Sequence, residues 1–287
     1  MKQASATRRP GTSGLAVLAL SGVLALSGCN LPVSPPSTAG AAPAAAPVTA
    51  GGGAAAAAVA AGAQVRNPAS GRLEAVVPDI SRSVLLIGDS QSEPADGWPR
   101  LGLAAAGYKV YFCGRGGTGF VAANGQTGNY VDALQDGDWL LPSGTPALIV
   151  IQGGGNDAAT GASDRQIVAN AETLIAELQS RYPGTRLAMI GTLARSKNDG
   201  GGRRTEVDAL LGTVAARHSL PFISVGDWLT RYGLAKDLAD AVHMNASGRQ
   251  SLGRLLDQQL RALGLDRNTV PDTSPVLAAG AGTTTGD

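Results

Sequence analysis

A serine, an aspartate and a histidine stand where their types and spacing could support nucleophilic catalysis. Gly88-Asp89-Ser90 follows a short apolar run, and a serine at the end of a buried strand can expose its hydroxyl to a cleft. Far along the chain, Asp240-x-x-His243 places a carboxylate within reach of an imidazole in one loop. Such a contact would fix the tautomer and stabilise the imidazolium that forms when the ring takes the serine proton. Gly-Asp-Ser is also an ordinary turn sequence, so only the presence of Asp240 and His243 makes Ser90 a candidate nucleophile.

The histidine content narrows the choice of general base. The chain has 2 histidines, and His218 precedes Leu220-Pro221 near the end of a predicted helix, where an interaction with the helix dipole accounts for it. His243 is therefore the candidate base, with Ser90 as nucleophile and Asp240 as third member. Two histidines so far apart in sequence do not suit a zinc site, and no metal or other cofactor is expected.

Acyl transfer also needs hydrogen-bond donors for the oxyanion of its tetrahedral intermediate. Gly153-Gly154-Gly155-Asn156-Asp157 follows the third apolar run, where glycines let the backbone approach a substrate and the Asn156 amide is a donor. Gly114–Gly119 follows the second run and offers backbone N–H groups. This block also reads as G-x-G-x-x-G, but a dinucleotide site needs a helix to begin at once, and residues 120–129 are rich in Gly, Asn and Thr.

At these four places the sequence resembles the SGNH (GDSL-type) hydrolase superfamily. Ser90 matches the Gly-Asp-Ser block, Gly119 the glycine block, Gly154-x-Asn156-Asp157 the Gly-x-Asn-Asp block, and Asp240-x-x-His243 the last block. Each block comes in the order of the family and after the expected element. The blocks are weak singly and specific together.

The resemblance implies an oxyanion hole formed by the Ser90 N–H, a glycine N–H and the Asn156 side chain. Gly116, Gly117 and Gly119 all remain candidates for the glycine, and the alignment of the block favours Gly119. The resemblance also implies catalysis by serine and histidine on a flavodoxin-like sandwich.

Three further features bear on the cleft. Gln91 stands where the common motif has Leu, a departure expected to affect substrate preference more than catalysis. Trp98, Trp139 and Trp228 are expected to be packing residues rather than sugar platforms, and Trp139, in the long connection before the third strand, is the best placed of the three to line the site. The glycine-rich stretch Arg195–Arg204 reads as a surface loop near the cleft, with its charges in solvent.

The elements that must position these residues follow from unbroken apolar runs alternating with helical stripes. Unbroken runs are typical of strands buried on both faces of a parallel sheet. The pattern predicts an α/β fold, a three-layer α/β/α sandwich with a mostly parallel sheet of about five strands. The predicted strands are Val84–Ile87, Lys109–Cys113, Ala147–Ile151, Leu187–Ile190 and Phe222–Val225. Helical spacing recurs within residues 163–182, 207–214 and 252–263.

The flanking segments predict export. Three basic residues precede the apolar stretch Leu15 to Leu26, which ends in the lipobox-like Leu26-Ser27-Gly28-Cys29. We expect a signal peptide over residues 1–28 and lipid on Cys29, which anchors the protein to the outer face of the cell membrane. An Ala/Pro/Gly-rich tether over 29–75, a hydrolase domain over 76–267 and a disordered tail over 268–287 complete the predicted organisation.

Composition limits the partners. Lys and Arg number 23 against 22 Asp and Glu, and this near-neutral balance without a basic block excludes a nucleic-acid partner. The expected substrate is a small-molecule or glycan ester with a short acyl group, such as O-acetyl. Two alternatives stay open: an acyltransferase using the same triad, and a non-catalytic glycan-binding lipoprotein. The membrane is expected to be reached only through the anchor, and the oligomeric state is not predicted.

Overall fold

The predicted strands form one parallel sheet. The computed structural model describes residues 62–267. Its five-stranded sheet has the order β4-β3-β5-β6-β7, with all neighbours parallel. This is the flavodoxin-like order, in which ligands bind at the carboxyl ends of the strands. The strands are β3 (Ser83–Gly88), β4 (Lys109–Gly114), β5 (Leu148–Gln152), β6 (Leu187–Ile190) and β7 (Phe222–Ile223).

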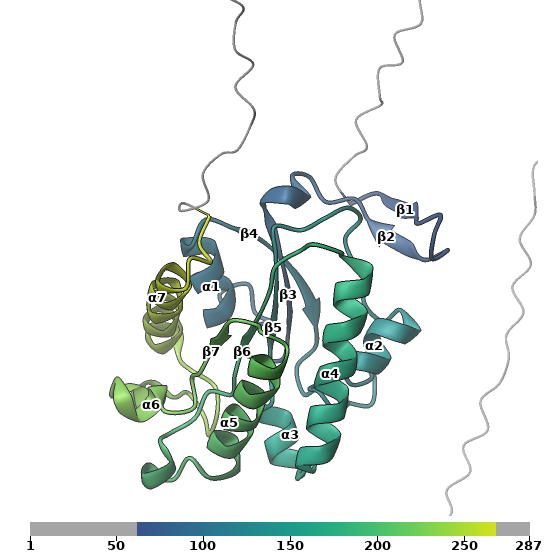
Figure 1. Cartoon of the computed structure of the whole chain (residues 1–287). Helices are drawn as coiled ribbons and strands as arrows, with labels where there is room; N and C mark the ends of the chain where they lie inside the picture. Colours follow the sequence, from purple (N-terminus) through teal and green to yellow (C-terminus); the bar gives the residue numbers. More distant parts are fainter. Residues whose placement is uncertain (1–61, 268–287) are drawn as a thin grey trace, which may run out of the picture. The chain divides into compact units, whose positions relative to one another are not determined.

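Helices cover both faces of the sheet, which gives the three predicted layers (Figure 1). Helices α2, α4 and α5 pack on one face, and α1, α6 and α7 on the other. The α-helices are α1 (Trp98–Ala105), α2 (Tyr130–Asp136), α3 (Gly155–Thr160), α4 (Asp164–Arg181), α5 (Gly202–Arg217), α6 (Trp228–Arg231) and α7 (Ala246–Ala262). Short 3₁₀ turns are η1 (Ile80–Arg82), η2 (Lys197–Asp199) and η3 (Leu234–Asp237).

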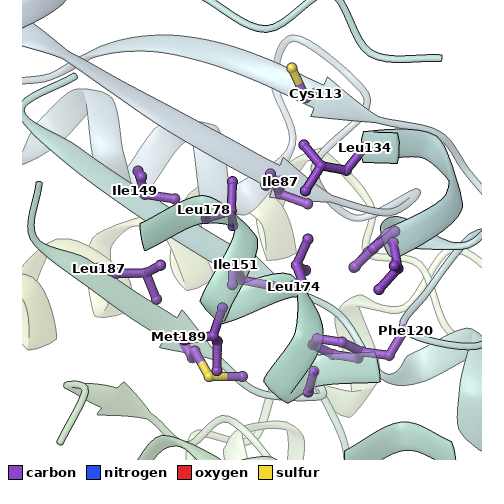
Figure 2. Packing of buried hydrophobic residues seen from close by; sticks show 14 of the residues in the cluster. Ile87, Cys113, Phe120, Leu134, Ile149, Ile151, Leu174, Leu178, Leu187 and Met189 are labelled. Carbon is purple, nitrogen blue, oxygen red and sulfur yellow. The ribbon is translucent and has the colours of Figure 1, made fainter. Parts of the chain in front are cut away.

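Strand β3 shows why the apolar runs are unbroken. Leu85 and Ile87 point into the core beneath α4, whereas Val84 and Leu86 point into the core beneath α1 and α7. Successive side chains of a strand alternate between faces, so a strand covered on both faces needs apolar residues throughout. Figure 2 shows the core on the α4 side, with Ile87, Leu174 and Leu178 close together.

Cys113 packs in that core (Figure 2). Burial raises the pKa of its thiol to about 12, so it stays neutral at physiological pH. A neutral buried thiol is a poor nucleophile, which fits a packing role.

Helix α4 begins and ends where the sequence indicates. Ser163 caps it by accepting from the Gln166 N–H, and the Gln166 side chain accepts from the Ser163 N–H, a capping box. Helices α1 and α7 approach closely because each has a glycine at the contact. A Cβ on Gly102 would lie 2.7 Å from Leu256, and one on Gly253 would lie 2.8 Å from Leu101.

The predicted boundary of the tether is wrong at its carboxyl end. The sequence predicts that residues 62–75 belong to the disordered tether, but β1 (Gln64–Arg66) and β2 (Leu73–Ala75) form an antiparallel hairpin. Their composition is poor in large apolar side chains, so polar contacts hold the hairpin in place. Glu74 pairs with Arg181 of α4 at 2.8 Å, and the Ala75 N–H donates to the Leu141 carbonyl at 2.9 Å.

Other predictions concern the segments on either side. The signal peptide 1–28, the lipid site Cys29, the tether up to residue 61 and the tail 268–287 lie outside the described residues. Within 62–267, no helix combines the length and apolarity needed to cross a membrane.

Candidate active site

Ser90 is presented by a tight turn directly after β3. The carboxylate of Asp89 is buried and accepts from the Gln91 N–H at 3.0 Å, while the Asp89 carbonyl accepts from the N–H groups of Ser92 and Glu93 at 2.9 Å each. Desolvation raises the pKa of Asp89 above its usual range. These bonds fold the chain back on itself, so that Ser90 stands at the carboxyl edge of the sheet.

His243 and Asp240 come to Ser90 from the loop between η3 and α7. The Nε2 atom of His243 lies 2.8 Å from Ser90 Oγ, and its Nδ1 atom lies 2.8 Å from Asp240 Oδ2. The three side chains that the sequence singled out are therefore joined in one hydrogen-bonded chain. Ser90 and His243 are 153 positions apart in the sequence, and the fold brings them together.

Asp240 is held ionised by the same loop. Its Oδ1 atom accepts from the N–H groups of His243 at 2.7 Å and Val242 at 2.8 Å. These two backbone donors, followed by the His243 ring, lower the pKa of Asp240 below its usual range. The carboxylate is 56% exposed, so hydrogen bonding rather than burial fixes its position.

The segment after β5 places the Asn156 side chain against Thr118 and the side chain of its neighbour Asp157 in the interior. Asn156 Nδ2 donates one hydrogen to the Thr118 carbonyl at 2.8 Å, which leaves its second amide hydrogen for another acceptor. Asp157 is fully buried and accepts from three backbone N–H groups of the glycine-block loop at 2.7–3.0 Å. These donors belong to Phe120, Val121 and Ala122.

The geometry of the glycine block favours Gly117 over Gly119 as an oxyanion donor. The Gly119 N–H already donates to the Ala122 carbonyl at 2.9 Å, and the Gly116 N–H donates to Glu93 at 2.8 Å. Of these three glycines, Gly117 alone has an N–H with no hydrogen-bond acceptor within residues 62–267. Gly116 lies against the turn that presents Ser90, since a Cβ on Gly116 would be 3.4 Å from Ser90 Cβ. The sequence alone favours Gly119, two positions further along, because the sequence does not show that the Gly119 N–H is already engaged.

Two charged residues near the site, the half-buried Arg204 and the buried Asp208, carry no signal in the sequence. Arg204 was expected in solvent, yet it donates to the carbonyls of Leu193 at 3.0 Å and Gly155 at 3.3 Å, and desolvation lowers its pKa. Asp208 accepts from the N–H groups of Thr192 and Val225 and thereby joins the loops after β6 and β7. The glycines at 200–202 indicate a loop in the sequence, but α5 already begins at Gly202. The helical register of α5 turns the side chains of Arg204 and Asp208 inward.

A small cavity opens at Ser90. Its volume is about 250 Å³, and it is lined by Ser90, Gln91, Glu93, Pro94, His243, Met244 and Arg249. Cavities of about 370 and 380 Å³ adjoin the β1–β2 hairpin instead. Trp139 lines the latter cavity and not the one at Ser90, and it is buried against Tyr130, so it is a packing residue and not the site-lining tryptophan that its position in the sequence also allows. It precedes β5 and therefore lies toward the opposite edge of the sheet.

Residues 86–250 of this 287-residue chain, more than half of it, match the model of the GDSL-like lipase/acylhydrolase family. A multidomain esterase from Ruminococcus flavefaciens is 27% identical over 141 residues, which cover 47% of this chain and 18% of the relative. The chain thus spans less than a fifth of that relative's length.

Solved structures share the fold. An active-site mutant of a family two carbohydrate esterase from Clostridium thermocellum aligns with a TM-score of 0.50 and 17% identity over 68% of both chains. A family 2 carbohydrate esterase with a carbohydrate binding domain from Corynascus thermopiles (Myceliophthora fergusii) gives 0.50 and 18% over 68% of this chain and 70% of that one. With the family match spanning every block around Ser90 and His243, this chain belongs to the GDSL-like lipase/acylhydrolase family.

Proposed function

We propose that the protein hydrolyses carboxylic esters through a triad of Ser90, His243 and Asp240. The observation that carries this proposal is the unbroken chain of two 2.8 Å contacts, from Ser90 Oγ to the imidazole and from the imidazole to Asp240. His243 Nε2 takes the hydroxyl proton as Oγ attacks the ester carbonyl, and Asp240 stabilises the imidazolium. The proton then passes to the leaving alcohol, and an acyl-enzyme remains.

Water completes the reaction by the reverse sequence. His243 takes a proton from water as the hydroxide attacks the acyl carbon, and the proton returns to Ser90 Oγ when the carboxylic acid leaves. We assign the oxyanion hole to the Ser90 N–H, the Gly117 N–H and the second hydrogen of the Asn156 amide. Support comes from the Gly117 N–H, which has no acceptor among residues 62–267, and from Asn156, whose contact with Thr118 fixes the amide.

For the substrate we propose a short acyl group, acetate above all, on a glycan. The carbohydrate esterases among the structures of this fold suggest the carrier. The physical support is the cavity of about 250 Å³ at Ser90, which is small and has the charged residues Glu93 and Arg249 in its wall. A long acyl chain needs a longer apolar channel. We expect kcat/KM on p-nitrophenyl esters to be highest at acetate, and a maximum at eight carbons or longer would overturn the assignment.

We further propose that the enzyme is exported and held at the outer face of the membrane by a diacylglyceryl group on Cys29. The support is the lipobox-like sequence before that cysteine. Two acyl chains give stable attachment where one gives only marginal binding. Cys29→Ala should release the protein from membranes or block its maturation, and unchanged detergent partitioning of that variant would argue for another anchor.

Labelling with a fluorophosphonate tests the triad. The wild-type protein should label on Ser90, and Ser90→Ala and His243→Ala should lose labelling and nearly all esterase activity, because nucleophile and base act as a unit. His218→Ala is the matched control, since it removes the other histidine at the end of α5, and it should label normally. A folded wild-type protein that neither labels nor cleaves activated esters would refute the proposal.

A further inference from the structure

Gln91, the residue next to Ser90, makes two hydrogen bonds with its side-chain amide. Its Nε2 donates to the Val242 carbonyl at 2.9 Å, and its Oε1 accepts from the Trp98 indole N–H at 3.1 Å. An indole N–H can only donate and a carbonyl can only accept, so the partners determine which way the amide is turned. Gln91 is only 7% exposed. We call this pair of bonds the Gln91 bridge.

One end of the Gln91 bridge rests on a rigid part of the molecule. Trp98 is fully buried at the start of α1 and packs against Trp228, with 6.1 Å between ring centroids. The neighbouring backbone is close as well, because a Cβ on Gly97 would lie 2.5 Å from the Gln91 carbonyl oxygen. The indole is therefore a fixed point from which the amide of Gln91 is aimed.

The other end holds an exposed loop. Residues 239–241 are exposed, and the loop closes on itself through the Ala239 N–H, which donates to the His243 carbonyl at 2.8 Å. Hydrogen bonds within the loop fix its conformation but do not connect it to the turn that presents Ser90. The Val242 carbonyl, one position before His243, receives its hydrogen bond from Gln91. The bridge thus runs beside the Ser90–His243 contact, from the residue after the nucleophile to the residue before the base.

We propose that Gln91 is a positioning residue that sets the distance and angle between Ser90 Oγ and His243 Nε2. The proposal rests on the triad assigned above. Leucine, the residue of the common motif, can neither donate to Val242 nor accept from Trp98, so this chain uses the position in a way that the motif does not. The role replaces the influence on substrate preference that the sequence suggests.

The experiment compares Gln91→Leu with the wild-type protein. Releasing the loop should lower kcat by about 10- to 100-fold, the range expected when reacting groups are misplaced by about 1 Å. KM should change less than about twofold, since the oxyanion donors are unchanged and only one of the seven residues that line the cavity is replaced, by a side chain of similar size. Ser90 remains, so fluorophosphonate labelling should reach completion at a rate reduced in the same proportion.

A double variant separates positioning from stability. Gln91→Leu leaves the Trp98 N–H buried without an acceptor, which lowers Tm. Gln91→Leu with Trp98→Phe removes that unpaired donor, so Tm should recover in part, less the cost of the smaller ring in a buried site, while kcat stays low. Trp98→Phe alone keeps the bond to Val242 and should lower kcat by less than Gln91→Leu does.

Two results would overturn the positioning role: wild-type kcat and labelling rate in Gln91→Leu, or recovery of kcat together with Tm in the double variant. A changed preference for acyl length at unchanged kcat on acetate would return the position to substrate selection. These outcomes all presuppose a wild-type protein that labels. A wild type that does not label refutes the triad, and the positioning role with it.

Discussion

Carboxylates do two different jobs at the carboxyl edge of this sheet. Asp157 and Asp208 are buried, and their oxygens accept from backbone N–H groups of loops. Asp240 also accepts from backbone N–H groups, but it is 56% exposed and keeps one oxygen for the ring of His243. All three carboxylates accept hydrogen bonds from backbone N–H groups, but Asp157 and Asp208 are buried whereas Asp240 is exposed to solvent.

The difference shows that hydrogen bonds from backbone N–H groups to a carboxylate can stabilise the fold at one position and orient a catalytic residue at another. A buried carboxylate satisfies N–H groups that water cannot reach, so its removal leaves orphan donors and costs stability. An exposed carboxylate leaves donors that water can satisfy, so its removal costs little stability. What Asp240 contributes is the orientation and charge of the base. Substituting these carboxylates one at a time should therefore separate a loss of catalytic activity from a loss of folding stability.

The largest effect should be on catalysis at Asp240. Asp240→Asn presents an amide to His243 and no longer stabilises the imidazolium, so kcat should fall by about 10³- to 10⁴-fold. Tm should stay close to that of the wild type. Asp136→Asn, which changes an exposed carboxylate at the end of α2, is the matched control and should retain full activity. Activity within tenfold of wild type would remove Asp240 from the triad.

A large loss of stability should follow at Asp157. Asp157→Ala leaves the N–H groups of Phe120, Val121 and Ala122 without their acceptor. At roughly 1–3 kcal/mol for each buried group left unpaired, partly offset by relaxation of the loop, the free energy of unfolding should fall by about 3–5 kcal/mol. Urea denaturation measures this. A loss below about 1 kcal/mol would mean that water reaches the loop.

The neighbouring Asn156 should behave in the opposite way. Asn156→Ala removes an oxyanion donor, so kcat should fall by about 10²- to 10³-fold with a smaller change in KM. Its amide is partly exposed, so unfolding should change by less than about 1 kcal/mol. A variant that changed only KM would assign Asn156 to substrate positioning.

The smallest effect is a difference in pH dependence. Desolvation raises the pKa of Asp208, so its contribution to stability is greatest in acid and declines as pH rises through its folded pKa. Hydrogen bonds lower the pKa of Asp240, so its contribution is present above about pH 4 and is lost as pH falls. From about pH 3 to 6, the stability gap between wild type and Asp208→Asn should narrow with rising pH, and that for Asp240→Asn should widen. Parallel slopes, measured by urea denaturation, would contradict the comparison.

The sequence predicts the parts of this fold that have a period or a motif. The five strands follow from apolar runs, and α4, α5 and α7 are long enough for a helical stripe to repeat. Helices α1, α2 and α3 have eight, seven and six residues, too few for a stripe to stand out. The β1–β2 hairpin has little apolar surface and depends on partners such as Arg181, more than a hundred positions away.

In the candidate site, too, some residues can be predicted from sequence motifs and others only from the folded structure. Ser90, Asp240, His243 and Asn156 carry motif signals, and the structure brings them to one edge of the sheet. The choice among Gly116, Gly117 and Gly119 depends on which N–H is already engaged, and that is a property of the folded loop. The partners of Gln91 at positions 98 and 242 are likewise joined only by the fold.

The β1–β2 hairpin also fixes where the described chain begins relative to the cleft. The hairpin contacts Leu141 and Pro142, which precede β5, and Arg267 donates from its N–H to the Ala106 carbonyl, just before β4. Both ends of the described chain therefore lie at the edge of the sheet opposite Ser90 (Figure 1). Coupling the domain by either end to a bead or an electrode would leave the cleft facing the bulk solution, so the immobilised enzyme should admit polymeric esters as freely as small ones.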